Sequence, residues 1–288
     1  MAVPLLQLQD HLTQLEIAPT LGASLANWQV RATGQPLLRP ADQAALATGS
    51  PRRLGCYPLV PWSNRIAEGG IAGPEGWLAL PPNTDHDPYP IHGSAWQQPW
   101  QVEHHSQRRA RLSLHSQVPF AYRATLDVQL HEGCLSLDLH VTHLDARPMW
   151  HGVGFHPYFP RYTDTQLQVA AHRVWVGDEG QLPSRLADIP APWRFDEQKG
   201  LPPQTVDHAF SGWAGGCIIQ QPGYALHCHA SGAEHYLLFC PQGQPFFCFE
   251  PVSHPINAHH LPGRPGLRLM HREETLHLRF SMRYQSNC

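Results

Sequence analysis

The chain has 288 residues and a formal net charge of −3, with 42% hydrophobic and 15% charged residues. Its longest basic run is QRRAR at 107–111, which is too short for the basic patch of a nucleic-acid-binding surface, so no nucleic-acid partner is expected. No stretch of about 18 apolar residues could span a bilayer, so no membrane association is expected either.

Cysteine usage indicates a reducing compartment. The seven cysteines are odd in number and contain no C-x-x-C pair, which favours free thiols over a disulfide framework or a zinc site. They are Cys56, Cys134, Cys217, Cys228, Cys240, Cys248 and Cys288. The first 19 residues lack a positively charged region followed by an apolar stretch and a small-residue cleavage site. We therefore expect a cytoplasmic protein.

The predicted elements are almost all strands. A short helix is expected at 40–49, PADQAALATG, and a strand at 111–116, RLSLHS. In 124–144, ATLDVQLHEGCLSLDLHVTHL, apolar and polar residues alternate on both sides of the HEG turn. This pattern predicts a β-hairpin with one buried face.

The C-terminal half continues the strand pattern with one exception. Segment 181–205 is rich in proline and lacks alternation, and its Leu, Ile, Trp and Phe residues favour an ordered excursion packed on a sandwich over an interdomain linker. Strands are expected at 235–240, HYLLFC, and at 275–284, TLHLRFSMRY. We therefore predict an all-β sandwich with long functional loops, with residues 1–288 forming one domain.

Two polar stretches in the first third of the chain contain candidate site residues. In GCYPLVPWSNRI, 55–66, Arg65 follows a segment stiffened by prolines, where a guanidinium could orient hydroxyls or stabilise an oxyanion. The alternative is a surface arginine that stacks on Trp62. In NTDHDPYPIHGSAW, 83–96, His92 precedes a glycine that permits close approach of a ligand. With 21 histidines in the chain, a structural role for His92 is the alternative.

A third stretch, GFHPYFP at 154–160, places His156 before a proline and beside Tyr158 and Phe159. A residue before proline is held in an extended conformation, so His156 cannot lie in a helix. An imidazole titrates near pH 6.5 and can act as acid or base at neutral pH. The stretch therefore predicts either a proton-transferring histidine held in a cleft or a packed corner between strands.

A fourth stretch, FFCFEPVSHPINA at 246–258, places Glu250 at the end of an apolar run that reads as a buried strand. Loss of solvation raises the pKa of a carboxylate toward the range of a general base. The alternative is a structural ion pair with an arginine.

One competing pattern indicates a metal site. HCHASGAEH at 227–235 has the His-x-His-x4-Glu spacing of metal-binding cupins, with His227, His229 and Glu234 as ligands. The glycines that cupin sites carry on both sides are replaced by Gln221 and Pro241. Without these glycines, the stretch is better explained as an ordinary strand with two solvent-facing histidines.

Taken together, the motifs resemble the aldose 1-epimerase (galactose mutarotase) family. The resemblance rests on YPLVPWSNRI, NTDHDPYPIHG, PMWHGVGFHPYF, VDHAF and FEPVSHPINA, in that order, and runs from about residue 15 to about residue 260. It implies a large antiparallel β-sandwich and an isomerase that interconverts the α and β anomers of a free aldohexose. It implies no cofactor and no metal.

The resemblance also implies residue roles. Glu250 would be the base at the anomeric hydroxyl and His156 the acid at the ring oxygen, with His92 assisting. The residues implied to bind the sugar are Arg65, Asp207, Asn64, Trp62 and Tyr158. The partner is then a small-molecule sugar, and the protein a monomer or homodimer.

Two alternatives to this function stay open. A hexose-6-phosphate mutarotase would need basic residues near the phosphate, for which Arg52, Arg53 and Arg65 are candidates. A non-catalytic sugar-binding or sensing protein of the same fold would need no matched acid and base. The sequence also departs from many relatives after the HG of 92–93, where SAWQQPW suggests that Trp96 and Gln97 line a pocket of different shape.

Overall fold

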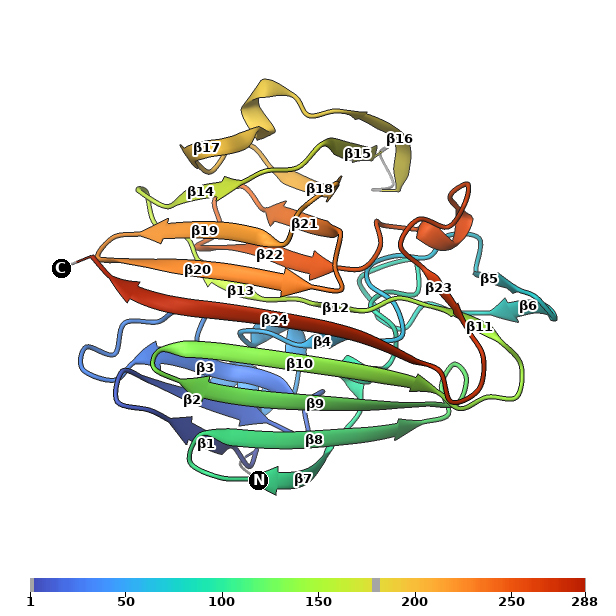
Figure 1. The fold of residues 1–288 in the computed structure, drawn as a ribbon, viewed down its shortest axis with the longest axis horizontal. Helices are drawn as coiled ribbons and strands as arrows, with labels where there is room; N and C mark the ends of the chain where they lie inside the picture. The colour runs from blue at the N-terminus through green and yellow to red at the C-terminus, as the bar shows by residue number, and fades with distance from the viewer. Residues whose placement is uncertain (1–2, 178–181, 288) are drawn as a thin grey trace.

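The structure is a computed structural model that describes residues 3–177 and 182–287. Two large antiparallel sheets dominate it (Figure 1). The first has nine strands, in the order β17 (Phe195–Gly200), β14 (Gln166–Val169), β19 (Gly216–Gln221), β20 (Tyr224–Ser231), β24 (Thr275–Ser286), β10 (Cys134–His143), β9 (Tyr122–His131), β8 (Arg109–Ser116) and β7 (Gln101–His105).

The second large sheet has eight strands. Its path is β16 (Pro183–Asp188), β15 (Arg173–Gly177), β18 (Val206–Ser211), β21 (His235–Cys240), β22 (Phe246–Val252), β12 (Gly154–Phe155) and β4 (Pro58–Leu59), and β13 (Tyr158–Pro160) pairs with β22. The prediction of an all-β, antiparallel sandwich is confirmed.

Smaller elements complete the described fold. Three strands form a separate sheet, β1 (Leu6–Gln9), β2 (Thr13–Ala18) and β3 (Ser24–Val30), and two pairs are β5 (Gly70–Gly73) with β6 (Gly76–Ala79) and β11 (Met149–His151) with β23 (Arg268–Met270). The helical elements are α1 (Gln43–Thr48) and the 3₁₀ turns η1 (Pro51–Arg53), η2 (Ala95–Gln97), η3 (Ala191–Trp193) and η4 (Ala258–His260). No helix in the described residues is long and apolar enough to cross a membrane.

The main core lies between the two large sheets. Leu137 of β10 lies opposite Val128 of β9, and both side chains are buried, as the alternation of the hairpin predicts. Phe280 of β24 and Phe155 of β12 stack across the two sheets, with ring centroids 6.4 Å apart. Burying such rings is the largest source of stability in a sandwich of this kind.

Segment 181–205 forms an ordered excursion, as predicted, although residue 181 lies outside the described part of the chain. It supplies β16 to the edge of the eight-stranded sheet and β17 to the edge of the nine-stranded sheet. Most side chains of β16 and β17 are exposed or only partly buried, so neither strand has the one buried face that regular alternation requires. The α1 helix and the strands at 111–116, 235–240 and 275–284 are confirmed.

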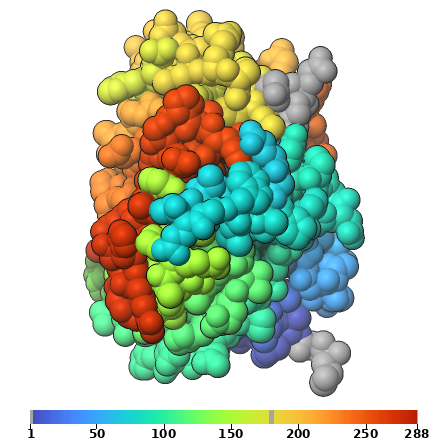
Figure 2. Space-filling view, turned by 90° about the vertical axis from the view of Figure 1, so that its right-hand side faces the viewer, coloured from blue at the N-terminus to red at the C-terminus, as the bar shows by residue number. Residues whose placement is uncertain are grey.

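One end of the molecule is covered by loops and short elements. Figure 2 shows this end, with the β5–β6 hairpin lying beside the segment that contains η4. His260 of η4 contacts the Gly70 carbonyl through Nε2 at 2.8 Å, and its ring packs on Trp77 with centroids 6.1 Å apart. Among the described cysteines all six are free, as predicted, and Cys288 lies outside the described residues.

Candidate active site

Three neighbouring strands of the eight-stranded sheet send alternate side chains to opposite faces. On β22, Phe247 and Phe249 enter the main core, whereas Cys248 packs in a second cluster on the other face. Because side chains alternate along a strand, Glu250 points with Cys248, away from the main core. The pairing of the strands places Asp207 of β18 opposite Phe239 of β21 and Leu237 of β21 opposite Glu250. The sheet thus brings two carboxylates and a phenylalanine to one face.

Loops from the first third of the chain close over this face. Asn64 and His92 both have left-handed backbones, with φ of 58° and 62°, a conformation in which Asn and His are enriched among non-glycine residues. The next residue, Gly93, also has positive φ, and a Cβ there would lie 2.0 Å from the Val60 carbonyl oxygen. Only glycine fits at this position. The tight turn directs the His92 ring toward the sheet.

A cavity of about 330 Å³ lies between the sheet face and these loops. Its lining residues are Arg52, Asn64, Arg65, His86, Ile91, His92, His156, Asp207, Phe239 and Glu250. A cavity of this size and polarity accommodates one small polar molecule.

His156 and Glu250 are in direct contact inside this cavity. The His156 Nε2 atom lies 3.4 Å from the Glu250 Oε1 atom, and both side chains are buried. Burial raises the pKa of Glu250 well above its usual range, the Asp207 carboxylate raises it further, and Arg65 opposes the rise. Burial lowers the pKa of His156 well below 6.5, and the cationic Arg52 and Arg39 lower it further. A carboxylate with raised pKa is a stronger base, and an imidazolium with lowered pKa is a stronger acid.

Aromatic rings fix the orientation of His156. Its ring stacks on Tyr57, with centroids 4.8 Å apart, and on Tyr158, with centroids 4.6 Å apart. The Arg39 guanidinium lies over the Tyr158 ring, 3.6 Å from its centroid, and donates to the carbonyls of Arg52 and Leu54. His156 is therefore held at one angle by packing.

The protonation form of His92 follows from its hydrogen bond. The Asn64 backbone N–H donates to His92 Nδ1 at 3.0 Å, so Nδ1 must be the unprotonated nitrogen. Burial, and then the neighbouring His156, lower the pKa of His92 well below 6.5. A neutral imidazole with a free electron pair at Nδ1 carries its proton on Nε2. His92 is thus a hydrogen-bond donor through Nε2, not a second base.

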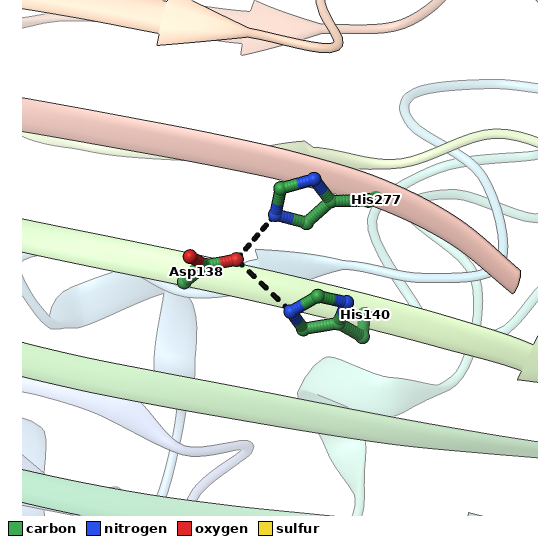
Figure 3. Close-up of side chains that lie close together, drawn as sticks. All are labelled: Asp138, His140 and His277. Atoms are coloured by element: carbon green, nitrogen blue, oxygen red, sulfur yellow. Dashed lines mark hydrogen bonds and ion pairs between the residues drawn. The ribbon is translucent and has the colours of Figure 1, made fainter.

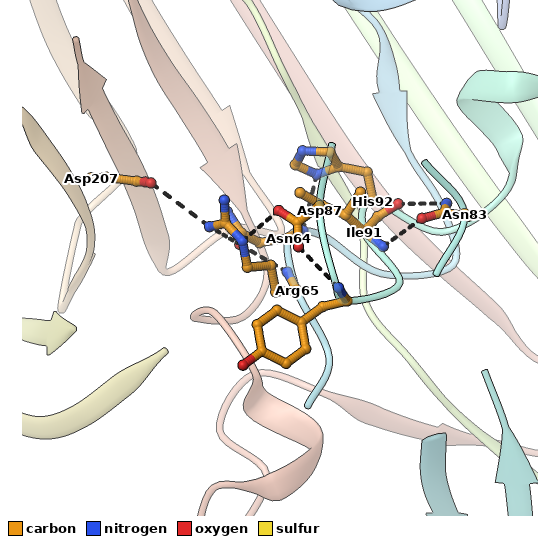
Figure 4. Close-up of polar contacts among 8 residues, drawn as sticks. Asn64, Arg65, Asn83, Asp87, Ile91, His92 and Asp207 are labelled. Carbon is orange, nitrogen blue, oxygen red and sulfur yellow. Dashed lines mark hydrogen bonds and ion pairs between the residues drawn. The ribbon is translucent and has the colours of Figure 1, made fainter. Parts of the chain in front are cut away.

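A charged network orients Arg65 (Figure 4). Its Nε donates to Asp87 Oδ2 at 2.7 Å, and its Nη1 lies 3.7 Å from Asp207 Oδ2. The Asn64 side-chain oxygen accepts from the Arg65 backbone N–H at 2.8 Å. Burial raises the pKa of Asp207, and Arg65 opposes this rise. The network holds a guanidinium at the cavity wall, where it can bind hydroxyl oxygens.

The loop that carries His92 is clamped by a residue outside the cavity lining. Asn83 accepts from the Ile91 N–H at 2.8 Å and donates to the carbonyls of Ile91, at 2.9 Å, and Gly93, at 3.0 Å (Figure 4). An amide that satisfies three backbone groups rigidifies the turn.

Six of the eight predicted site residues line the cavity together. They are His156, Glu250, His92, Arg65, Asp207 and Asn64. Tyr158 lies against His156 and Arg39 and is not among the lining residues. Trp62 is also absent from the lining: it packs edge-on against His259 and borders a different, more apolar cavity. The chain turns sharply at the left-handed Asn64, so Trp62 and Arg65 point in different directions.

Three lining residues and Asp87 were not predicted from the sequence. His86, Ile91 and Phe239 line the cavity, and Arg52 was considered only for a phosphate. Phe239 could have been found from the alternation of HYLLFC, which places it on the face opposite Leu238. Arg52 and His86 also border a neighbouring cavity of about 340 Å³, together with Trp96 and Gln97. These last two residues therefore shape an adjoining space.

Three buried polar atoms of the cavity residues lack protein partners in the described part of the chain. They are Oε2 of Glu250, Nδ1 of His156 and Nη1 of Arg52. A buried polar group without a partner costs about 1–3 kcal/mol. Such atoms mark where a polar ligand can form hydrogen bonds.

A metal could in principle be held at this site by His156, Cys248 and Glu250, whose ligand atoms lie within 4.8 Å of one another. Burial raises the pKa of the Cys248 thiol well above its usual value, with Glu250 adding to the rise. Because the thiolate and not the thiol is the metal ligand, a Cys248 that stays protonated does not suit a metal at this position. The cupin-like set of His227, His229 and Glu234 does not gather among the described residues.

Comparisons with known proteins place the chain in one group. The sequence model for aldose 1-epimerase matches residues 4–283. The uncharacterised protein YphB of Escherichia coli K12 is 32% identical over 239 residues, which cover 79% of this chain and 81% of YphB. The crystal structure of a candidate aldose 1-epimerase from Escherichia coli K12 has a TM-score of 0.91 at 29% identity, over 98% of this chain and 99% of that one. A galactose mutarotase-like protein of Clostridium acetobutylicum shares the fold, with a TM-score of 0.85 at 15% identity over 97% and 94% of the two chains.

Proposed function

The chain belongs to the aldose 1-epimerase family, and we propose that it interconverts the α and β anomers of a free aldohexose, with Glu250 as base and His156 as acid. The contact between these two side chains supports the proposal most directly. In a cyclic sugar the anomeric hydroxyl and the ring oxygen are bonded to the same carbon. A base and an acid that serve both oxygens must therefore lie close together, as Nε2 and Oε1 do at 3.4 Å.

The reaction proceeds by ring opening. The Glu250 carboxylate takes the proton of the anomeric hydroxyl, the C1–O1 bond becomes a carbonyl, and the bond between C1 and the ring oxygen breaks. The His156 imidazolium gives its proton to that oxygen. The aldehyde then rotates about the C1–C2 bond, and the reverse proton transfers close the ring on the other face. General acid and general base each contribute about 10²–10⁴-fold.

The pair keeps one proton throughout this cycle. Before ring opening the proton is on His156, and afterwards it is on Glu250. Burial raises the pKa of Glu250 and lowers that of His156, and both shifts favour the second arrangement. The two shifts therefore favour the proton transfers that open the ring and disfavour the charged pair that precedes them. Arg65 lowers the pKa of Glu250 and so opposes complete neutralisation of the carboxylate that must act as base.

The remaining cavity residues supply sugar binding. His92 donates through Nε2, and the Arg65 guanidinium and Asp207 carboxylate offer a donor and an acceptor from one wall. Phe239 provides an apolar surface for the ring carbons. No step of this scheme requires a metal or a redox cofactor.

Polarimetry of freshly dissolved α-glucose and α-galactose tests the proposal. We expect wild type to accelerate the decay of rotation well above buffer, and Glu250→Gln and His156→Ala to fall back toward the buffer rate. A wild type that binds these sugars but leaves their decay unchanged would favour the sugar-binding alternative and reject turnover.

One observation on Arg52 favours a hexose 6-phosphate as the substrate. Its Nη1 atom is buried without a protein partner, and the side chain borders both the active cavity and the neighbouring one. Arg53 does not support this substrate, because it is exposed and pairs with Asp42 at 3.4 Å. Glucose 6-phosphate in the same assay separates the two substrates: a preference for it that Arg52→Ala abolishes would assign the phosphorylated sugar.

A further inference from the structure

A cluster of possible metal ligands lies on the outer face of the nine-stranded sheet. It consists of Asp138 and His140 of β10 and His277 of β24, whose ligand atoms all lie within 4.8 Å of one another (Figure 3). His140 Nε2 lies 3.1 Å from Asp138 Oδ1, and His277 Nε2 contacts the same oxygen. The three side chains are 30–44% exposed, so ions in solution can reach them.

The two strands hold this cluster in place. Asp138 and His140 are two residues apart and therefore share one face of β10, and His277 lies directly opposite His140 in the β10–β24 register. The intervening Leu139 and Leu278 are fully buried in the core and anchor the backbone from below. The two imidazole rings stack with centroids 4.4 Å apart and planes 14° apart. The cluster is therefore built on the middle of the sheet and not on loops.

We infer that this cluster, which we call the β10–β24 triad, binds a divalent transition-metal ion of the Zn²⁺ class. Two imidazole nitrogens and one carboxylate oxygen form a ligand set that suits Zn²⁺, Co²⁺, Ni²⁺ and Cu²⁺. Around a tetrahedral ion with bonds of about 2.0–2.2 Å, ligand atoms lie roughly 3.3–3.6 Å apart. The separation of 3.1 Å between His140 Nε2 and Asp138 Oδ1 is close to this spacing. The contact between His277 Nε2 and the same oxygen is shorter, so His277 must move away from the carboxylate and turn out of its stack on His140 to bind the ion. Solvent exposure leaves the fourth position to water.

Charged groups of both signs surround the triad. Arg109, Arg111 and Asp127 line the same surface cavity as Asp138 and His140. Asp127 of β9 lies opposite Asp138, and its charge is paired by a bidentate contact with Arg111, at 2.7 and 2.8 Å. Arg279 lies opposite Asp138 on β24, but among the described residues no ion pair within 4 Å joins its exposed guanidinium to that carboxylate. Among the described residues, Asp138 is therefore contacted by the two histidines and by no arginine within 4 Å. A divalent ion bound at the triad would neutralise this carboxylate.

The triad is separate from the proposed catalytic cavity. It shares no residue with the lining of that cavity, which faces the other large sheet. A metal at the triad would link β10 to β24 and stabilise the folded chain, since an ion that binds only the native state raises its stability. It would take no part in the proton transfers of the sugar reaction.

Calorimetric titration of the full chain, without a polyhistidine tag, with ZnCl₂ tests the inference. We expect wild type to bind Zn²⁺ at the triad, and His140→Ala and His277→Ala each to weaken that binding by at least about tenfold. The matched control is His229→Ala, because His229 is an exposed histidine of β20 on the same sheet and belongs to no ligand group in the described chain. Its affinity should equal that of wild type.

Thermal unfolding supplies a second measurement. At one fixed Zn²⁺ concentration, Zn²⁺ should raise the Tm of wild type and of His229→Ala by the same amount, and that of His140→Ala and His277→Ala by clearly less. Exposed histidines tolerate substitution, and equal Tm values without zinc would verify that all four proteins fold alike. Absence of Zn²⁺ binding by wild type, unchanged binding in both triad variants, or an equal loss in His229→Ala would each overturn the inference. Sugar turnover plays no part in this test, so its failure and that of the proposed function are distinguishable.

Discussion

Lowering the pH from 7 to 5 should destabilise the protein, and His254 provides a defined part of that loss. His254 Nδ1 donates to the Pro255 carbonyl at 2.8 Å, and its Nε2 accepts from the Ser63 N–H at 3.0 Å. The ring is buried, and it links the loop before Arg65 to the chain that leaves β22. Protonation of Nε2 would break the bond from Ser63.

The magnitude follows from the shift in pKa. Burial lowers the pKa of His254 from 6.5 to about 4 in the folded state. The unfolded chain therefore binds more protons below pH 6.5, so the stability contributed by neutral His254 is present above pH 6.5 and is lost as the pH falls toward 4. With about 1.4 kcal/mol per pKa unit, the loss between pH 7 and pH 5 is about 2 kcal/mol.

Urea unfolding at pH 7 and pH 5 measures this contribution. For wild type and for His254→Gln, the free energy of unfolding at pH 5 is subtracted from that at pH 7. Comparing these two differences removes effects of the substitution that do not depend on pH. The variant should lose about 2 kcal/mol less than wild type between pH 7 and pH 5. His115→Gln, which changes an exposed histidine of β8, serves as the control and should follow wild type. Equal pH dependence in wild type and His254→Gln would refute the reasoning.

Three further predictions concern Gly93, Arg65 and the removal of metal ions. Gly93→Ala should destabilise the fold by about 1–3 kcal/mol in urea unfolding, because its Cβ would lie 2.0 Å from the Val60 carbonyl oxygen and its φ is +66°. Arg65→Gln should lower kcat/KM for the sugar by about tenfold or more, whereas Arg53→Gln, at an exposed ion pair, should leave it unchanged. Dialysis against EDTA should leave mutarotation rates unchanged, since acid and base are both protein side chains. A loss of turnover that Zn²⁺ restores would contradict this.

Alternation predicted the parts of the fold where one face of a long strand is buried. The hairpin of β9 and β10 and the strand β24 are of this kind, because every second side chain enters the core between the sheets. Strands β4, β12 and β13 have two or three residues each, which is too short for any period to be visible. They carry or flank Tyr57, His156 and Tyr158, so the geometry around His156 could be anticipated only from motifs.

The site residues also fall into those that the sequence could predict and those that it could not. Glu250 could be predicted because a carboxylate directly after an apolar run is poorly explained by solubility alone. The structure corrects its position: Glu250 lies inside β22, which continues to Val252, and it points away from the main core with Cys248. The direction of Trp62 could not be predicted, because it depends on the left-handed backbone at Asn64, which separates Trp62 from Arg65. The partners of Arg65 could not be predicted either. Asp87 and Asp207 lie 22 and 142 residues from Arg65 in sequence and come close to it only in the folded chain.

The central claim is that Glu250 and His156 act as one acid–base pair, and a double-mutant cycle on kcat/KM for anomer exchange tests it most directly. Glu250→Gln and His156→Ala should each lower kcat/KM by about 10²–10⁴-fold, and the double variant should be little slower than the slower single variant, because residues that act as a unit are not additive. Single variants that keep nearly full activity, or losses that multiply in the double variant, would contradict the account.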